Sequence, residues 1–339
     1  MKELKKIEDI VFFTINGANI FYANRNSLFL NEKLFLSEIE DRLMELAKYN
    51  ENYSLLFTNG NGYITYGYGN KQLFKLPFWC HTAVICNDII AVYDYDYDLL
   101  TPLNNIYNIK QNLLILPEWH KGRCCVVNPY IYIYIYQQEI SCINLSNSNC
   151  WQFSIAAFPN YISASFREQK ADVQYIIGVY NNILWVHIGG FRLVGIDVET
   201  GKQAHYIENV VKGGEQNNFL DTQNGVLKTL SFDYYAEFDL QTLQFRKQTI
   251  IESEENIKIR ASNFYEGDKH LYFCGYRNNK FDKPNTFGIF DTEKASVVWY
   301  DKTKDDLGYF YNPLQANDKL LAILDDKHNL LIYDRIENI

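Results

Sequence analysis

Short runs of alternating apolar and polar residues fill most of the chain, and residues 183–207 show the pattern most clearly. Three such runs follow one another there, ILWVHI, FRLVGID and QAHYI, separated by Gly189-Gly190 and by Thr200-Gly201. Alternation with a period of two is typical of a strand, and glycine accepts the positive φ that a tight hairpin turn requires. The segment therefore predicts a three-stranded antiparallel meander.

The end of the second strand of this meander recurs in the C-terminal half of the chain. In each copy an apolar strand ends in aspartate and a polar turn follows; the aspartates are Asp197, Asp239, Asp291 and Asp334. Their spacing of roughly 40–50 residues is typical of propeller blades. We expect each carboxylate to accept hydrogen bonds from amides of its own turn, an interpretation favoured over a ligand role.

Weaker copies of the hairpin lie in the first half, at residues 53–68 with two Asn-Gly turns and at residues 130–145 with the run YIYIYIY. With this hairpin pattern the chain resembles the β-propeller superfamily of WD40-like and quinoprotein-like repeats, without their regular Trp-Asp, Gly-His or kelch double-glycine signatures. The resemblance implies an all-β fold with one propeller domain over residues 1–339. Seven blades are favoured, and six or eight are the alternatives. Because propellers commonly close with a strand from one terminus, we expect residues 10–15 to supply that N-terminal closing strand.

One segment departs from the strand pattern. Apolar residues recur at helical spacing from Leu36 to Leu46, and Ser37 with Glu40 matches a capping box. We therefore predict one short inserted helix near residues 37–49.

Composition and charge narrow the class of protein. The chain has 27 Tyr and 22 Phe, which suit a pleated, half-buried surface, and it carries a net charge of −9. The acidic balance argues against a nucleic-acid partner and makes a basic protein partner the better electrostatic match. Seven cysteines without regular spacing, no signal peptide and no long apolar run favour a cytoplasmic monomer with reduced thiols and no membrane contact.

The candidate binding residues lie in two segments that we expect on one face of a propeller. The run Tyr93 to Asp98 alternates Tyr and Asp, and residues 277–285 form a long loop after an equivalent strand. In a propeller, the connection between the second and third strands opens on the same face as the connection into the next blade. Long loops on a rigid scaffold are usual places for binding, although ordinary blade elaborations would look the same. The predicted binding face consists of Tyr93, Asp94, Tyr95, Asp96, Tyr97, Asp98, Arg277, Lys280, Phe281 and Asp282.

Catalytic and metal motifs are missing. The acidic run lacks the glycine and distal glutamate of a calcium loop, and none of the six histidines has a metal-ligand partner at ligand spacing. Phosphate loops and nucleophile elbows are also missing, so no catalytic residue, metal or cofactor is assigned. We predict a non-catalytic protein-binding propeller, in its narrowest form a bacterial inhibitor or immunity-type protein that blocks a toxin or enzyme. The alternatives are a carbohydrate-active propeller enzyme, either a glycoside hydrolase or a lyase, with its site at the central channel, and a sensor domain separated from its complex.

Overall fold

The protein is built from β-strands, as predicted. The computed structural model describes residues 1–17, 19–37, 43–50, 53–58, 63–65, 73–75, 82–86, 89–96, 101–108, 111, 113–116, 123–128, 131–136, 138–144, 150–163, 165–253, 255–265, 267–278, 280–302, 304 and 306–335. In this part of the chain the single helical element is a short 3-10 turn, η1 (Glu215–Asn217). The strands group into two compact units, residues 1–39 with 212–339 and residues 40–211. The expectation of a single domain over residues 1–339 stays a prediction.

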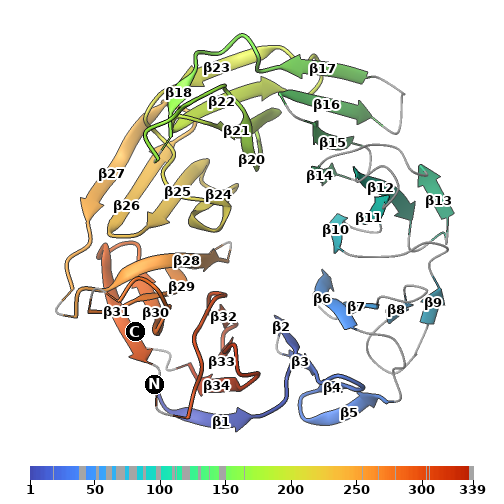
Figure 1. The fold of residues 1–339 in the computed structure, drawn as a ribbon, viewed down its shortest axis with the longest axis vertical. Coiled ribbons are helices and arrows are strands. Elements are labelled where there is room, and N and C mark those ends of the chain that lie inside the picture. Colours follow the sequence, from blue (N-terminus) through green and yellow to red (C-terminus); the bar gives the residue numbers. More distant parts are fainter. Residues whose placement is uncertain are drawn as a thin grey trace. The chain divides into compact units, whose positions relative to one another are not determined.

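The first unit contains four antiparallel sheets of four strands each (Figure 1). Sheet B has strands β2 (Phe12–Asn16), β3 (Asn19–Ala23), β4 (Leu28–Leu30) and β5 (Lys33–Leu36), and sheet I has β24 (Asn218–Asp221), β25 (Val226–Ser231), β26 (Tyr234–Asp239) and β27 (Gln244–Ile250). Sheet J has β28 (Lys258–Phe264), β29 (His270–Tyr276), β30 (Thr286–Asp291) and β31 (Ser296–Lys302), and sheet A has β32 (Gln315–Ala316), β33 (Leu320–Leu324), β34 (Leu330–Asp334) and β1 (Glu3–Ile7).

A strand from the N-terminus does complete the last sheet, but it is not the segment that the sequence indicated. The strand β1, blue in Figure 1, pairs with the red β34, with Ile7 opposite Leu330. Residues 12–15 of the predicted closing segment instead belong to β2, the first strand of sheet B. The prediction of residues 10–15 was wrong because an edge strand needs no apolar alternation: Glu3 and Lys6 of β1 form ion pairs with Lys304 and Asp306.

The first four strands of the second unit are β6 (Leu43–Asn50), β7 (Tyr53–Thr58), β8 (Tyr63–Thr65) and β9 (Leu73–Lys75). The helix predicted near residues 37–49 is wrong over residues 43–49, which belong to β6 and pair with β7; residues 38–42 lie outside the described ones. The leucine spacing of this segment fits a helix, but a strand satisfies the same backbone groups by pairing with its neighbour, and that tertiary partner decides the outcome.

Three four-stranded sheets and one small hairpin make up the rest of the second unit. Sheet E has β10 (Thr82–Cys86), β11 (Ile89–Asp96), β12 (Thr101–Asn108) and β13 (Leu113–Leu116). Sheet F has β14 (Arg123–Asn128), β15 (Ile131–Tyr136), β16 (Glu139–Asn144) and β17 (Cys150–Ser154). Sheet H has β20 (Val173–Tyr180), β21 (Ile183–Ile188), β22 (Arg192–Asp197) and β23 (Gln203–Ile207). The hairpin consists of β18 (Tyr161–Ile162) and β19 (Glu168–Gln169). As predicted, β21, β22 and β23 form a meander, and the YIYIYIY run contributes a middle strand, β15.

The number of four-strand groups is larger than the favoured seven. Seven sheets with four strands are present among the described residues. Between β5 and β10 along the chain, β6 pairs with β7, β8 pairs with β9, and β7 contacts β8. With this additional group the described strands make eight groups of four, the upper of the two alternatives.

Neighbouring sheets pack through buried aromatic and aliphatic side chains. Phe273 and Phe290 of sheet J lie in one cluster with Tyr235 of sheet I, while Phe287 lies in another with Tyr333 of sheet A. Sheet J is therefore apolar on both faces, as expected for a sheet held between two others. This rigid stack positions the connections between its strands.

The repeated aspartates form the turns that the sequence predicted. Asp197 accepts hydrogen bonds from the amides of Glu199 and Thr200, at 3.2 and 2.8 Å. Asp239 and Asp291 accept equivalent bonds from amides two and three residues further on, at 2.8–2.9 Å. For Asp334 the residues after 335 lie outside the described part, so the prediction stands untested there.

Candidate functional site

The first predicted segment lies on a paired strand rather than in a loop. Tyr93, Asp94, Tyr95 and Asp96 are the last residues of β11, the second strand of its sheet, and they pair with β12 from Asn104 to Thr101. Tyr97 and Asp98 lie outside the described residues. The strand β11 begins at Ile89 and therefore extends through the first four residues of the Tyr-Asp run.

The second predicted segment, residues 277–285, joins β29 to β30 in the first unit. Arg277 forms an ion pair with Glu255, whose carbonyl also accepts the amide of Asn278 at 3.1 Å. Glu255 belongs to the connection from sheet I to sheet J. On the other side, Pro284 accepts the amide of Phe310, which lies in the connection from sheet J to sheet A, at 3.0 Å. In this unit, therefore, the connection between the second and third strands does meet the connections between sheets, as predicted.

The loop carries an exposed aromatic ring that contacts a second one. Phe281 is 46% exposed, and its ring centroid lies 5.6 Å from that of Phe232, which is 44% exposed in the β25–β26 turn. The partly buried Tyr276 supports Phe281 edge-on at 5.9 Å. A third exposed ring, Tyr311 at 41%, lies in the connection from β31 to β32. Adjacent exposed rings of this size are typical of interaction sites rather than of ordinary surface.

The backbone of Phe232 adds to this conclusion. Its φ of 56° lies in the left-handed region, which costs an ordinary side chain roughly 1–2 kcal/mol. Glycine or asparagine would occupy the same turn at lower cost. A phenylalanine held there with an exposed ring is stabilising neither its turn nor the core, and such strain is commonly found at functional positions.

Cations stand over several rings of these connections. Lys258 lies 5.3 Å from the Phe232 ring, Lys212 3.9 Å from Tyr234, Lys283 4.9 Å from Tyr309 and Arg260 5.4 Å from Tyr311. We call these residues, together with Arg277, Lys280, Phe281 and Asp282, the aromatic–cation surface. It contains all four of the predicted site residues from the 277–285 loop.

Two acidic groups of this surface are already neutralised. Asp233 pairs with Lys258 at 2.8 Å, and Glu255 pairs with Arg277. Partial desolvation acts to raise the pKa of Glu255, but the Arg277 guanidinium outweighs it and holds this pKa below its ordinary value. The Glu255 carboxylate therefore stays ionised at neutral pH, and the two ion pairs fix the positions of Lys258 and Arg277.

The small hairpin of the second unit is a further exposed element, which the sequence did not reveal. Its tip residue Phe166 is 90% exposed and has a φ of 57°. Arg192, only 4% exposed, anchors the hairpin by donating to the carbonyls of Pro159 and Gly189 at 2.7 and 2.5 Å. The available signal was a lone phenylalanine in the polar stretch SASFREQ, which is outside the repeat pattern.

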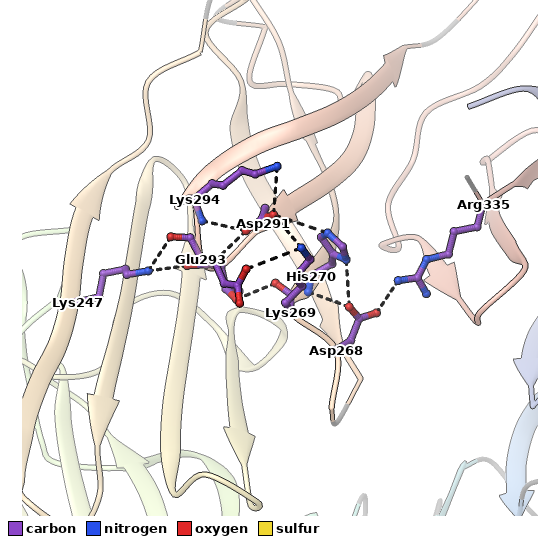
Figure 2. Close-up of polar contacts among 9 residues, drawn as sticks. Lys247, Asp268, Lys269, His270, Asp291, Glu293, Lys294 and Arg335 are labelled. Atoms are coloured by element: carbon purple, nitrogen blue, oxygen red, sulfur yellow. Dashed lines mark hydrogen bonds and ion pairs between the residues drawn. The ribbon is translucent and has the colours of Figure 1, made fainter. Parts of the chain in front are cut away.

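A polar cluster lies at the ends of β29 and β30 that are remote from the 277–285 loop (Figure 2). Asp268 bonds the Nδ1 of His270 at 3.1 Å and pairs with Arg335 at 3.0 Å, while the Nε2 of His270 lies 3.9 Å from Asp291. Burial acts to raise the pKa of Asp268, but the bonds from His270 and Tyr272 and the charge of Arg335 hold it well below its ordinary value.

This cluster connects sheets. Lys247 of sheet I donates to the carbonyls of Thr292 and Glu293 at 2.7 and 3.1 Å, and Arg335 follows the last strand of sheet A. His270 and Asp291 are buried. Within the described ranges, no group of three or more His, Cys, Asp and Glu side chains is placed to hold a metal. The cluster is therefore an inter-sheet contact rather than a site open to a substrate.

Comparisons with known proteins give the fold. No protein-family model and no curated protein matches the sequence. The structure is similar to BamB from Moraxella catarrhalis, with a TM-score of 0.63 and 11% identity over 98% of this chain and 99% of that one. It is also similar to the computationally designed Ika8 protein, with a TM-score of 0.66 and 10% identity over 98% of both chains, and to Saccharomyces cerevisiae Sqt1, with a TM-score of 0.63 and 8% identity over 98% of both.

These full-length similarities show that the chain has the β-propeller fold, which confirms the predicted fold class. At identities of 11% or less they bear on the fold alone. None of the helical elements in the described residues is long and apolar enough to cross a bilayer.

Proposed function

We propose that this β-propeller is a non-catalytic binding protein that presents the aromatic–cation surface to a protein partner. The observation that carries the proposal is the contact between Phe232 and Phe281, two exposed rings from different sheet connections. Aromatic side chains and arginine are enriched at the centres of protein interfaces, and exposed rings of this kind gain most when a partner removes them from water.

The scaffold supports the same proposal. The rings belong to connections that are tied to buried sheets by Arg277–Glu255 and by backbone bonds from Phe310 and Asn278. A surface already held in its binding geometry loses little conformational entropy when a partner binds, which raises affinity for a given area.

In its narrower form, the proposal is that the protein acts in the cytoplasm as a monomeric inhibitor or immunity-type protein for a toxin or enzyme. The net charge of −9 supports a partner that is basic as a whole, because opposite net charges accelerate encounter. The lack of catalytic motifs in the sequence is consistent with a partner-blocking role.

The proposal is tested by photocrosslinking in the native cell. A photoreactive phenylalanine analogue is placed at position 281, and a matched one replaces Leu34, an exposed residue on the edge strand of sheet B. A discrete heterologous adduct is expected at position 281 and not at position 34. Adducts equal at both positions, or no adduct at position 281, would contradict the proposal.

A further inference from the structure

The residue opposite the turn aspartate is aliphatic in three copies of the repeat and histidine in the fourth. In the cross-strand pairs it is Ile183 for Asp197, Val226 for Asp239, Leu320 for Asp334 and His270 for Asp291. The turns at Asp197 and Asp239 form without a histidine at this position. The buried imidazole of His270 therefore adds chemistry that the turn itself does not need.

On one side, the ring of His270 is connected to sheet A (Figure 2). Arg335, which follows β34, pairs with Asp268 at 3.0 Å, and Asp268 lies 3.1 Å from the Nδ1 of His270. Because an ionised carboxylate only accepts hydrogen bonds, this network assigns the proton of the neutral ring to Nδ1. The Nε2 atom of the neutral ring is therefore an acceptor.

On the other side, Asp291 is connected to sheet I. Its Oδ1 atom accepts two amides of the turn 292–294 at 2.9 Å, and Lys247 of sheet I donates to two carbonyls of this turn. Its Oδ2 atom lies 3.9 Å from the Nε2 of His270, too far for a hydrogen bond. Both atoms are buried, and neither has a hydrogen-bond partner in the part of the chain that the structure describes. This gap interrupts the polar contacts that otherwise run from sheet A to sheet I.

Other donors near the gap do not fill it. Lys269 and Lys294 stand 3.8 and 3.7 Å from the Oδ2 of Asp291, but both side chains are exposed, so water screens their charges. Lys269 is also shared with Glu293 at 3.8 Å. The neighbouring tyrosine hydroxyls donate to other carboxylates, Tyr272 to Asp268 and Tyr235 to Glu237. A proton on Nε2 supplies the bond that both buried atoms lack, and an unmade bond between buried groups is costly.

The two carboxylates beside the ring keep their charge at neutral and mildly acid pH. Burial acts to raise the pKa of Asp291, but the amides of Lys294 and Glu293 and the charges of Lys269 and Lys294 hold it below its ordinary value. The pKa of Asp268 is lowered as well. Between about pH 8 and about pH 5 histidine is the residue type that gains a proton, so protonation of a carboxyl group does not close the gap in this range.

We propose that His270 is a proton-operated clasp between sheets A, J and I, in which a proton on Nε2 gives an N–H that donates to Asp291. The bond completes the polar contacts from Arg335 to Lys247, and it joins charged partners, the stronger class of hydrogen bond. Because only the folded chain offers this acceptor to the protonated ring, protonation favours the fold, and stability rises as the pH falls from about 8 to about 5. The clasp is a property of the scaffold and does not rest on the proposed function.

The test follows denaturant unfolding of the full chain at several pH values between about 8 and about 5. His270→Leu installs the aliphatic type that the other copies have, and the backbone amide of residue 270 still donates to Asp268. The unfolding equilibrium constant of the unchanged protein, divided by that of this variant, is expected to fall about tenfold as the pH falls over this range. A ratio that stays constant or rises would overturn the inference.

Two asparagine backgrounds locate the effect at the gap. Asp291→Asn keeps an oxygen for the turn amides and presents an N–H to the neutral Nε2, so in this background the same ratio is expected to stay constant or to rise on acidification. Asp197→Asn is the matched control, because Asp197 forms the same turn opposite Ile183; here the tenfold fall should persist. A fall that persists with Asp291→Asn, or that disappears with Asp197→Asn, would contradict the clasp.

Amide exchange of Thr292 reports the joint without a substitution at His270. This amide donates to the carbonyl of Lys269 at 2.9 Å, beside the gap. Its protection factor is expected to rise about tenfold between about pH 8 and about pH 5 in the unchanged protein and not in Asp291→Asn. A protection factor that does not rise in the unchanged protein, or that rises equally in both, would overturn the inference.

Discussion

Phe232 and Ile259 exchange two backbone hydrogen bonds, from the Phe232 amide at 2.9 Å and to the Phe232 carbonyl at 2.7 Å. This isolated bridge ties the β25–β26 turn of sheet I to the first strand of sheet J. It holds an exposed aromatic residue in the left-handed region, where the side chain lies beside Phe281 and Lys258.

The substitution Phe232→Asn should separate stability from binding. Asparagine tolerates the left-handed region, so the variant is expected to unfold at the same temperature or a few degrees higher, a gain of up to about 1 kcal/mol. Crosslinking at position 281 is expected to fall, because the neighbouring ring is gone. Calorimetry measures the unfolding temperature, and the crosslinking yield at position 281 measures binding. A variant that is less stable and crosslinks equally well would contradict a functional role for Phe232.

Removal of β1 should destabilise the first unit. Deleting residues 1–8 leaves β34 with an unpaired edge and removes the bonds that join β1 to it. We expect the free energy of unfolding to fall by about 3 kcal/mol or more and the thermal transition, measured by calorimetry, to broaden. The control is Lys6→Gln, which removes exposed ion pairs with Glu8 and Asp306 but keeps the strand; it should change little. A deletion variant that melts like the intact chain would show that β1 does not hold the sheet.

Asp239 should make stability depend on acid pH. The amide of Thr242 lowers its pKa from 3.8 to about 2, and Arg246 and Gln241 act in the same direction while burial opposes them. Because the folded pKa is below the unfolded one, the ionised group stabilises the fold above about pH 4, and this contribution is lost as the pH falls through about 2. Asp239→Asn should therefore cost about 1 kcal/mol at neutral pH and progressively less between about pH 4 and pH 2. Denaturant unfolding at several pH values measures the difference in unfolding free energy between the unchanged protein and the variant. A difference that stays constant down to pH 2 would show that the carboxylate charge does not contribute to stability.

The docking of the β18–β19 hairpin should depend on Gly189. A Cβ at this position would overlap the Tyr161 ring, so Gly189→Ala is expected to displace the hairpin at a cost of about 1–3 kcal/mol. Amide exchange in residues 161–169 should become faster. Gly214 is the matched control, since a Cβ there would have its nearest neighbour 3.9 Å away and Gly214→Ala should be close to neutral. Unchanged exchange in the hairpin would mean that Tyr161 does not anchor it.

Sequence alone determined what depends on neighbouring residues. The turns at Asp197, Asp239 and Asp291 form from bonds within three residues, and the alternation of β21 and β22 follows from the pleat, so the repeat and the β-propeller class could be predicted. Residues 277–285 could be placed on the correct connection because strand order within a sheet follows chain order.

Tertiary structure decided what depends on partners far along the chain. The charged β1 closes the last sheet because β34 offers an edge, and residues 43–50 form a strand because β7 pairs with them, neither of which local pattern reveals. The aromatic–cation surface is of the same kind. Phe232, Phe281 and Tyr311 lie in three different connections, and only the stacking of sheets I, J and A brings their rings and cations onto one surface.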